Sequence, residues 1–476
     1  MTTPIADPLE LIAAYVGNAR WFGGKGRPFA LAGRRRLGRV PGSPGPDDAA
    51  EGPRAAIDLV TVDYADAVGG TEIYQLPLAF YGEPQEHLAH ALVGMWEDED
   101  FGPSHVYDAV HDRYAMAFWL NAFADPRDEG PLRFHRLPGH EFDLESHSTL
   151  FSGEQSNSSV AFGEDSLMKV FRKITPGHNP DISVHEVLTR AGSDHVAALY
   201  GWLEVEEDEA SGSGGGVLQL AMLQQFLRTA SDGWDLALTS VRNLFAEADL
   251  HADEVGGDFA GESARLGVAL AETHASLQEH FPTHTWSTEQ VTSLVDGMHR
   301  RLDAALDVVP ELAEHADRLR ATYDHVRRIR DLTVQQIHAD LHLGQTLRTV
   351  RGWKIVDFEG EPAKPLSERL LPDSRWRDVA GMLRSFDYAP RVVERTVKES
   401  EYVGAEQRAF RAAEWAERNR GAFLSAYAGG ELTVDQETLL SAYVADKAVY
   451  EVVYEARNRP GWVDIPLDAI RRIEKS

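Results

Sequence analysis

The sequence predicts an α+β fold with a strand-rich N-terminal half and a mostly helical C-terminal half. Two observations carry this prediction. Apolar runs of strand length, separated by Gly, Pro, Asp and Ser turns, recur up to residue 226. Apolar side chains then recur at helical spacing between residues 234 and 330, as at Leu266, Leu270 and Leu277. A chain of 476 residues is long enough for two or three domains.

Composition limits the functional classes. The net charge of −29 argues against general binding to nucleic acid or to an anionic membrane. Apolar residues make up 43% of the chain, which suffices for a packed core, and the sequence has no cysteine for a disulfide framework. No stretch approaches 18 apolar residues, and residues 1–17 lack the basic start of a secretion signal. We therefore expect a cytoplasmic protein with small-molecule partners, of open oligomeric state.

The first hundred residues predict a small sheet with helices. A helix over residues 9–17 leads to the glycine-rich string R-W-F-G-G-K-G-R, which lacks the spacing of a nucleotide-binding P-loop. Residues 41–53 form a Pro/Gly/Asp loop. Further elements are expected as strands over 56–62 and 72–80 and as helices over 86–97 and 107–123. The boundary of this segment lies near Asp100.

A strand–turn–strand pattern follows from Phe134 and predicts a phosphate site. The small-residue turn of residues 151–159 contains Gly153, Gln155 and Ser156, whose amides and hydroxyls could cover phosphates. Lys169 lies in the strand of residues 167–171, where its point charge could pair with them. Asn179 and Pro180 then start a helix.

Strands over residues 197–205 and 217–226 are joined by an acidic and glycine-rich loop. The second strand ends in Gln224, Phe226 and Leu227, which we interpret as a hinge whose backbone could bind adenine. A plain buried strand explains the same residues.

The stretch Q-Q-I-H-A-D-L-H-L-G-Q, followed by W-K-I-V-D-F-E-G-E-P, predicts two polar loops that each follow a short strand. This arrangement suits phosphoryl transfer, in which Asp340 orients the attacking hydroxyl and accepts its proton. Gln345 and Asp357 offer the oxygen ligands that Mg²⁺ prefers. Glu359 could support the metal through water or reach the acceptor. His338 is expected to shape the loop beside the acceptor rather than to transfer protons.

The spacing H-x-D-x-x-x-x-[N/Q] followed by D-F resembles the catalytic loop of protein kinases. The string H-A-D-L-H-L-G-Q is similar to that of aminoglycoside phosphotransferases. D-F-E-G-E-P and R-D-V-A-G-M-L-R-S-F-D-Y-A resemble the actinobacterial maltokinases and their relatives that act on glucosamine.

This resemblance implies a bilobal protein-kinase-like fold with an N-terminal α+β cap. We expect a cap over residues 1–100, a small lobe over 101–227 and a helical lobe over 228–476. It also implies ATP and Mg²⁺ as cofactors, with Lys169 on the phosphates. An acid on the helix after Asn179 should hold Lys169, and Glu186 is preferred to Asp181. Asp378 is expected to hold the backbone of the catalytic loop.

The acceptor pocket is predicted at two places. Asp387 and Tyr388 end the helix that Asp378 begins. A helix over residues 439–459 carries a stripe at spacings of 3 and 4, namely Tyr443, Lys447, Tyr450, Tyr454 and Arg457. Sugar pockets combine aromatic faces with carboxylates and amides, and the acceptor residues predicted here are Tyr454, Glu455, Asn458 and Trp462. Packing of this helix on its own lobe explains the pattern equally well.

The resemblance implies an ATP- and Mg²⁺-dependent sugar kinase. Glucosamine, phosphorylated on its 6-hydroxyl, is the favoured acceptor because Ser183, the H-A-D variant, the diverged cap and the acidic balance depart from maltokinases. Its ammonium group would need a carboxylate such as Glu455 or Asp387. The alternatives are a maltokinase that makes maltose 1-phosphate, an aminoglycoside kinase and a catalytically silent binding module.

Overall fold

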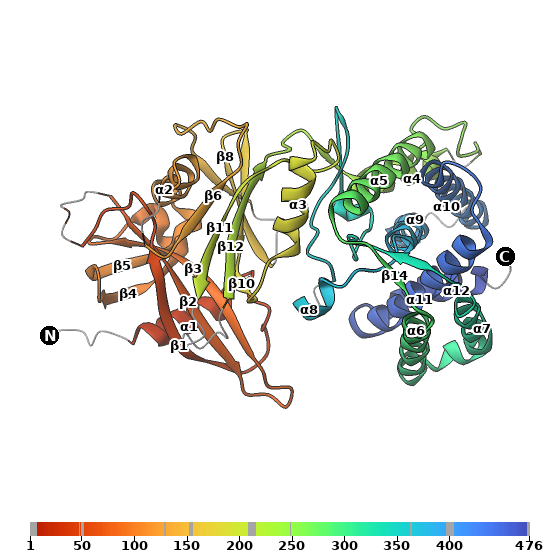
Figure 1. The fold of residues 1–476 in the computed structure, drawn as a ribbon, viewed down its shortest axis with the longest axis horizontal. Coiled ribbons are helices and arrows are strands. Elements are labelled where there is room, and N and C mark those ends of the chain that lie inside the picture. Colours follow the sequence, from red (N-terminus) through yellow and green to blue (C-terminus); the bar gives the residue numbers. More distant parts are fainter. Residues whose placement is uncertain are drawn as a thin grey trace. The chain divides into compact units, whose positions relative to one another are not determined.

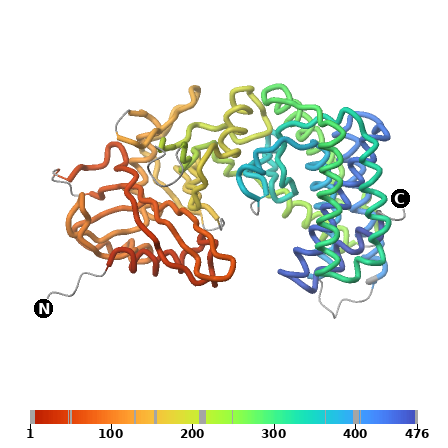
Figure 2. Tube along the Cα trace, turned by 60° about the horizontal axis from the view of Figure 1, so that its bottom comes forward, coloured from red at the N-terminus to blue at the C-terminus, as the bar shows by residue number. Residues whose placement is uncertain are grey.

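The computed structural model describes residues 7–46, 48, 52–127, 130–151, 156–207, 216–247, 249–361, 364–396 and 404–473 (Figure 1). The chain divides into two compact units. The first consists of Met1–Glu186 and Ala198–Arg228, and the second of Val187–Ala197 and Thr229–Ser476. In Figure 2 the strand-rich trace of the first unit contrasts with the long helical coils of the second.

The first unit begins with a six-stranded antiparallel sheet in the order β1-β2-β3-β5-β4, with β10 paired to β3. Its strands are β1 (Phe29–Arg39), β2 (Arg54–Tyr64), β3 (Thr71–Tyr81), β4 (Leu92–Asp98), β5 (Gly102–Asp108) and β10 (Lys173–Ile174). Successive side chains of a strand point to opposite faces. In β2, Ala56 and Val60 enter one core, and Ile57 and Leu59 enter another. The sheet is therefore buried on both faces at β2.

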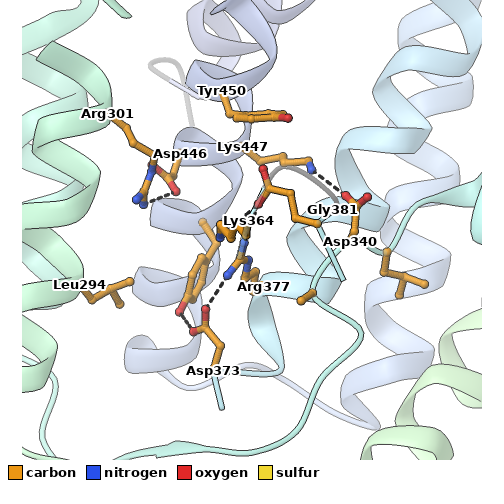
Figure 3. A pocket seen from close by; sticks show the side chains of 14 residues that line it. Leu294, Arg301, Asp340, Lys364, Asp373, Arg377, Gly381, Asp446, Lys447 and Tyr450 are labelled. Carbon is orange, nitrogen blue, oxygen red and sulfur yellow. Dashed lines mark hydrogen bonds and ion pairs between the residues drawn. The ribbon is translucent and has the colours of Figure 1, made fainter. Parts of the chain in front are cut away.

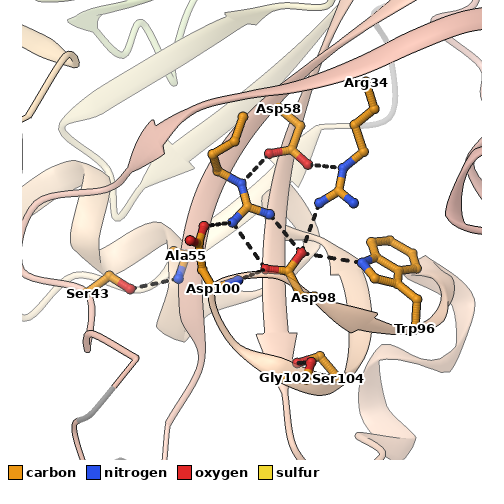
Figure 4. A network of polar contacts seen from close by, with 10 residues as sticks. Arg34, Ser43, Ala55, Asp58, Trp96, Asp98, Asp100, Gly102 and Ser104 are labelled. Atoms are coloured by element: carbon orange, nitrogen blue, oxygen red, sulfur yellow. Dashed lines mark hydrogen bonds and ion pairs between the residues drawn. The ribbon is translucent and has the colours of Figure 1, made fainter.

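Charged side chains bring the two edges of this sheet together (Figure 4). Asp58 of β2 is fully buried and accepts hydrogen bonds from Arg34 and Arg36 of β1, each at 2.5 Å. The same arginines reach Asp98 of β4 at 3.0 and 2.9 Å. Since β1 and β4 stand at opposite ends of the strand order, the sheet must curl to allow these contacts.

A second six-stranded antiparallel sheet has the order β6-β11-β12-β9-β8-β7. Its strands are β6 (Arg133–Arg136), β7 (Ser148–Phe151), β8 (Asn157–Phe162), β9 (Ser166–Phe171), β11 (Leu199–Glu207) and β12 (Gly216–Gln225). The helices of this region are α1 (Pro8–Asn18), α2 (Arg113–Ala124) and α3 (Pro180–Arg190). Gln75 of β3 ties the two sheets, because its buried amide donates to the carbonyls of Phe171 and Leu220, both at 2.9 Å.

The second unit is mostly helical. Its long helices are α4 (Gly233–Ala246), α5 (Ala260–His280), α6 (Thr288–Val308), α7 (Ala316–Val326), α9 (Trp376–Thr396), α10 (Ala405–Ala428), α11 (Val434–Asn458) and α12 (Asp464–Ile473). Short elements are α8 (Leu366–Arg369), β13 (Ser231–Asp232), β14 (His284–Trp286), β15 (Leu332–Val334), β16 (Thr346–Thr349) and β17 (Gly352–Ile355). Aromatic rings of Phe259, Phe386, Trp415 and Phe423 pack between the helices. No helix in the described ranges is long and apolar enough to span a membrane.

Most predicted elements are present, and two are wrong. The helix predicted over residues 86–97 is a 3₁₀ segment (Glu86–Ala91) followed by β4, whose burial follows the contacts of the sheet rather than a helical period. The helix predicted over 107–123 begins only at Arg113. Tyr107 and Asp108 belong to β5, and Asp112 caps α2 by accepting the N–H of Tyr114. In both cases sheet pairing overrides a helical pattern.

Candidate active site

The catalytic stretch follows β15. Gln335 and Asp373 exchange backbone hydrogen bonds, both at 3.0 Å, where the strand ends. Ala339 and Asp357 then adopt φ values of 71° and 69°, a left-handed conformation that non-glycine residues rarely take. Such strained positions cluster at functional sites. The two predicted loops thus carry backbone strain next to their predicted functional side chains.

Helix α9 holds the loop after β15 in place. The carboxylate of Asp378 accepts the backbone N–H groups of His338 at 2.7 Å and Ala339 at 2.8 Å. One turn on, Gly381 permits close approach, because an added Cβ would lie 2.4 Å from the carbonyl oxygen of Leu341. Ser385 accepts the N–H of Leu343 at 2.9 Å. The expected role of Asp378 as the anchor of this loop is confirmed.

Asp378 is itself supported from α5. His274 contacts Asp378 through Nε2 at 3.0 Å and Tyr427 through Nδ1 at 2.9 Å, and both His274 and Asp378 are buried. Burial alone would raise the pKa of Asp378, but the hydrogen bond and charge of His274 and the backbone donors hold it below its usual range. The anchor is therefore ionised at neutral pH.

His338 uses both ring nitrogens inside the loop. Its Nε2 lies 3.0 Å from the carbonyl oxygen of Val356 and must donate there, so Nδ1 is the acceptor of the Asp340 N–H at 3.3 Å. This arrangement links the two polar loops and fixes a neutral imidazole. It agrees with the loop-shaping role expected for His338, whereas a contact with the acceptor stays a prediction.

Gln345 and Asp357 meet as the sequence predicts. Gln345 Nε2 donates to Asp357 Oδ2 at 3.0 Å, and the N–H of Val356 donates to the carbonyl of Gln345 at 3.1 Å. The amide oxygen of Gln345 and the carboxylates of Asp357 and Glu359 provide hard oxygen donors on adjacent loops, a donor set that fits Mg²⁺. Their binding of a metal remains a proposal.

Asp340 opens onto a cavity of about 350 Å³ in the second unit (Figure 3). The cavity is rich in charged and aromatic side chains. Its lining consists of Leu294, Arg301, Ala339, Asp340, Leu341, Glu361, Lys364, Asp373, Arg377, Gly381, Tyr443, Asp446, Lys447 and Tyr450. A cavity of this size with converging polar groups is typical of a small-molecule site.

The carboxylates of this cavity differ in how firmly they are held. Arg301 pairs with both oxygens of Asp446 at 2.9 and 2.7 Å. Asp373 accepts from Tyr443 at 2.6 Å and Arg377 at 2.9 Å. Glu361 has longer contacts, 3.1 Å to Lys364 and 3.3 Å to Arg377. Glu361 is therefore the least tightly held of these three acids.

Lys447 and Tyr450 of α11 complete the wall beside the predicted base. Lys447 Nζ lies 3.3 Å from Asp340 Oδ1 and 5.1 Å from the centre of the Tyr450 ring. Burial, and then the charges of Glu361 and Asp340, raise the pKa of Tyr450 to about 12. The Tyr450 hydroxyl therefore stays protonated and can donate a hydrogen bond.

The acceptor residues predicted further along lie elsewhere. Asp387 is buried against Arg384 at 2.8 Å and Arg420 at 2.7 Å, and although burial opposes its charge, these arginines lower its pKa. Glu455 accepts from Arg459 at 2.6 Å. Both carboxylates are committed to arginines, so we do not assign either to an ammonium group.

The remaining three acceptor predictions, Tyr454, Asn458 and Trp462, are absent from the lining of the cavity as described. Tyr454 is 45% exposed and stacks on Tyr450 at 6.4 Å between ring centres. Asn458 donates to the carbonyl of Tyr454, and Arg459 lies over the ring of Trp462. These contacts fit the alternative in which the end of α11 packs on its own lobe.

In the first unit, Lys169 pairs with an acid of α3. Its Nζ lies 3.0 Å from Asp181 Oδ2, and both side chains are buried. Burial opposes the charge of Asp181, but Lys169 and His185 lower its pKa further than burial raises it. Lys169 thus pairs with Asp181, whereas the sequence favoured Glu186, whose role stays a prediction. Asn179 caps α3 as expected, since its Oδ1 accepts the N–H of Asp181 at 2.8 Å.

The predicted hinge follows β12. The N–H of Phe226 donates to the carbonyl of Asp165 at 2.8 Å, and its ring meets Phe151 edge-on at 5.4 Å. Gln224 pairs within the sheet, and Leu227 comes just before the chain enters the second unit at Thr229. Ser156 is exposed just before β8, and Gly153 and Gln155 lie outside the described residues. Binding of nucleotide by these six residues stays a prediction.

Ten of the fourteen cavity residues were not predicted as site residues, and six of these ten are charged, namely Arg301, Glu361, Lys364, Asp373, Arg377 and Asp446. The stripe Tyr443–Lys447–Tyr450 was a usable signal, because a helix places positions three and four apart on one face. Asp446 lies beside this stripe on α11. The other charged residues come from α6, from α9 and from the segments between β17 and α9, and no spacing along the chain relates them to Asp340.

Comparison with known proteins agrees with this architecture. Residues 15–112 match the maltokinase N-terminal cap domain. The chain is 29% identical over 326 residues to a glucosamine kinase of Streptacidiphilus jiangxiensis, covering 66% of this chain and 70% of that protein. It is 25% identical over 333 residues to a glucosamine kinase of Mycolicibacterium smegmatis, covering 66% and 76%.

Solved structures give the same fold. A glucosamine kinase in crystal form B superposes with a TM-score of 0.68 at 22% identity, covering 99% of this chain and 100% of that one. A glucosamine kinase in complex with glucosamine, ADP and inorganic phosphate gives 0.66 at 23% identity, covering 98% and 99%. The predicted fold and resemblance are confirmed: residues 15–112 match the maltokinase N-terminal cap domain, the chain is similar in sequence to glucosamine kinases, and it shares their fold.

Proposed function

We propose that this protein is an ATP-dependent glucosamine kinase that forms glucosamine 6-phosphate. The observation that carries the proposal is the position of Asp340, which opens onto the charged cavity while Gln345 and Asp357 lie together on the neighbouring loops. The two glucosamine kinases of similar sequence support the choice of acceptor. We place the reaction in the cytoplasm, where ATP is made.

In this mechanism Asp340 orients the 6-hydroxyl and accepts its proton. The sugar oxygen forms a bond to the γ-phosphorus as the bond between that phosphorus and the bridging oxygen of ADP breaks. Positioning and charge stabilisation dominate such transfers. Gln345, Asp357 and Glu359 would hold Mg²⁺, which when bound neutralises phosphate charge.

Lys169 is proposed to bind the phosphates of ATP. Its buried ion pair with Asp181 fixes the position of the ammonium group, and Lys169 of β9 is paired in register with Met222 of β12. A buried lysine needs such a partner to remain charged. The role of Gly153, Gln155, Ser156, Gln224, Phe226 and Leu227 in covering the phosphates and adenine belongs to the same proposal. The division of the chain into a cap (1–100), a small lobe (101–227) and a helical lobe (228–476) is also part of this proposal.

Glu361 is the carboxylate that we assign to the ammonium group of glucosamine. Its side chain lines the cavity with only 15% exposure, and its ion pair with Lys364 is 3.1 Å long. Lys364 is 34% exposed, so it can swing into solvent when the substrate cation arrives. Burial opposes the charge of Glu361, yet Lys364 lowers its pKa, so Glu361 is ionised at neutral pH. Tyr450 offers an aromatic face beside it.

The alternative is a maltokinase that makes maltose 1-phosphate, which the match of the cap domain favours. ATP consumption by purified protein with Mg²⁺ should be measured with glucosamine, glucose, maltose and kanamycin in parallel. We expect turnover with glucosamine well above the others, and faster turnover with maltose would overturn the proposal.

The variant Asp340→Asn tests the proposed base. We expect loss of turnover by a factor of about 10² or more with ATP binding retained. ATP binding should be followed by calorimetry on the same samples. Turnover near that of the wild type would exclude Asp340 as the base, and lack of turnover by the wild type with every acceptor would favour a silent binding module.

A further inference from the structure

A second cavity lies in the first unit. Its volume is about 560 Å³, and its walls come from α1, from the segment after it, and from strands β4, β7 and β8. The walls are mainly apolar and aromatic, with Leu11, Trp21, Val93, Leu150 and Phe151 among them. None of the catalytic or acceptor residues assigned above lines it. A cavity of this size is ample for a small organic molecule.

One polar group in the wall of this cavity is a buried guanidinium, that of Arg172. Arg172 is 1% exposed, donates from Nε to Ser158 Oγ at 2.8 Å, and donates from Nη2 to both oxygens of Asp108 at 3.0 and 2.8 Å. Trp21 lies against its face, with 4.8 Å between Cζ and the ring centre. Its Nη1 finds no hydrogen-bond partner among the described residues. An unmet donor on a buried charged group is costly, and a bound acceptor would satisfy it.

Asp108 cannot supply that acceptor, because it is already saturated. Its oxygens take the two bonds from Arg172, one from the hydroxyl of Tyr15 at 2.7 Å and one from the N–H of Val110 at 3.3 Å. Arg172 and Asp108 are therefore balanced in charge, but Nη1 of Arg172 is left without an acceptor among the described residues. The missing partner must come from outside this network.

Arg20, Arg172, His90 and His111 supply basic groups to the wall of the cavity. Burial lowers the pKa of His111, and Asp108 balances the charge of Arg172. Neither Asp nor Glu occurs among the described residues of the lining. This is unusual for a chain with a net charge of −29. The rings of His90 and His111 meet edge-on at 5.0 Å between centres. Positive and neutral donors without acids favour an anion.

We propose that this cavity binds a small organic anion with a flat apolar body, such as an aromatic carboxylate. The apolar body lies between the Trp21 and Phe151 walls, and the anionic group meets the donors of Arg172 and the histidines. The cavity is thus an effector site on the cap, separate from the phosphoryl-transfer site.

The contacts of Arg172 also connect this cavity to the proposed ATP site. Arg172 directly follows β9, which carries Lys169, and its partner Ser158 belongs to β8. An anion on Arg172 therefore acts on β9, which carries Lys169, and on β8, which directly follows the turn proposed to cover the phosphates. If that proposed function holds, occupancy of the cavity changes the KM for ATP more than the KM for the sugar.

The binding test does not depend on kinase activity. The probe is the aromatic sulfonate 8-anilinonaphthalene-1-sulfonate, whose fluorescence rises in an apolar site. Ala14 is an exposed residue of α1 that lines the cavity, and Ala14→Trp should fill it and weaken probe binding at least 10-fold. Ala409→Trp, at an exposed alanine of α10, is the matched control and should bind as the wild type. Equal binding by the two variants overturns the proposal.

A second pair of variants tests the sign of the charge. Leu92 lines the cavity and is 45% exposed, so we expect polar replacements there to be tolerated by the fold. Leu92→Asp should weaken probe binding at least 5-fold, whereas Leu92→Lys should retain or strengthen it. Equal weakening by both variants would exclude recognition of an anion. Circular dichroism will show whether Ala14→Trp folds. If it does not fold, the two Leu92 variants still test the proposal.

Discussion

Lys447 Nζ lies 3.3 Å from Asp340 Oδ1, although the two residues are 107 positions apart. Lys447 comes from α11 and Asp340 from the loop after β15, so this ion pair joins the wall of the cavity to the proposed catalytic base. An ion pair fixes the direction of a carboxylate as well as its charge. Lys447 is therefore proposed as a positioning residue for Asp340.

Replacing Lys447 with Met should lower kcat/KM for the sugar about 10- to 100-fold, because a misplaced catalytic group costs that much in rate. Lys447→Arg should recover part of the loss, since it restores the cation. Steady-state kinetics of both variants check this, and equal losses in the two would argue against a role for the charge. Binding of ATP, followed in parallel, should be unchanged.

Glu361→Gln should raise the KM for glucosamine about 10- to 100-fold, because a hydrogen bond between two charged groups contributes about 1.5–3 kcal/mol. The KM for glucose, which has no ammonium group, should change little. Glu368→Gln, at an exposed acid of α8, is the control. If glucose and glucosamine lose affinity alike, Glu361 does not bind the amine.

Asp181→Asn should raise the KM for ATP while leaving the KM for the sugar nearly unchanged. Asp181 holds the buried ammonium of Lys169 at 3.0 Å, and an amide cannot balance that charge. The cost to stability should be about 3–5 kcal/mol, so the assay belongs at low temperature with a thermal unfolding curve beside it. A variant with the stability and KM of the wild type would show that another acid holds Lys169.

Asp378→Asn should lower the free energy of unfolding by about 2–3 kcal/mol at pH 7, because an amide cannot accept all the bonds from His338, Ala339 and His274. The folded state lowers the pKa of Asp378, so its stabilisation is present above the unfolded pKa of about 3.9 and is lost as pH falls further. The difference between wild type and variant should therefore be largest above pH 5 and shrink toward pH 3.

Denaturant unfolding across that pH range measures this difference. Asp307→Asn, at an exposed acid of α6, serves as the control. A difference that grows as the pH falls would contradict the assigned ionisation of Asp378.

The contacts among residues 338–357 could be predicted from the sequence, because these residues are close together along the chain. His338, Asp340, Gln345 and Asp357 meet because two strands and their loops place them together, and these contacts need no information from distant segments. His274 follows Leu270 by four positions on the apolar face of α5, and its hydrogen bonds to Tyr427 and Asp378 satisfy both ring nitrogens within the core.

What the sequence could not predict depends on tertiary pairing. Asp387 sits in a motif that resembles a functional string, but Arg420 of α10 and Arg472 of α12 neutralise it from other helices. The polar walls of the cavity at Asp340 come from α6, α9 and α11, and the spacing within one helix does not reveal which other helix it will face. The same limit explains β4, where pairing with β5 replaces a helical pattern.

The most direct test of the central claim is NMR of the product formed from ATP and glucosamine by the purified protein with Mg²⁺. Coupling between ³¹P and the protons on carbon 6 would place the phosphate on the 6-hydroxyl, which is the result that the account predicts. Phosphate found instead on the anomeric oxygen of maltose, with glucosamine left unchanged, would contradict it.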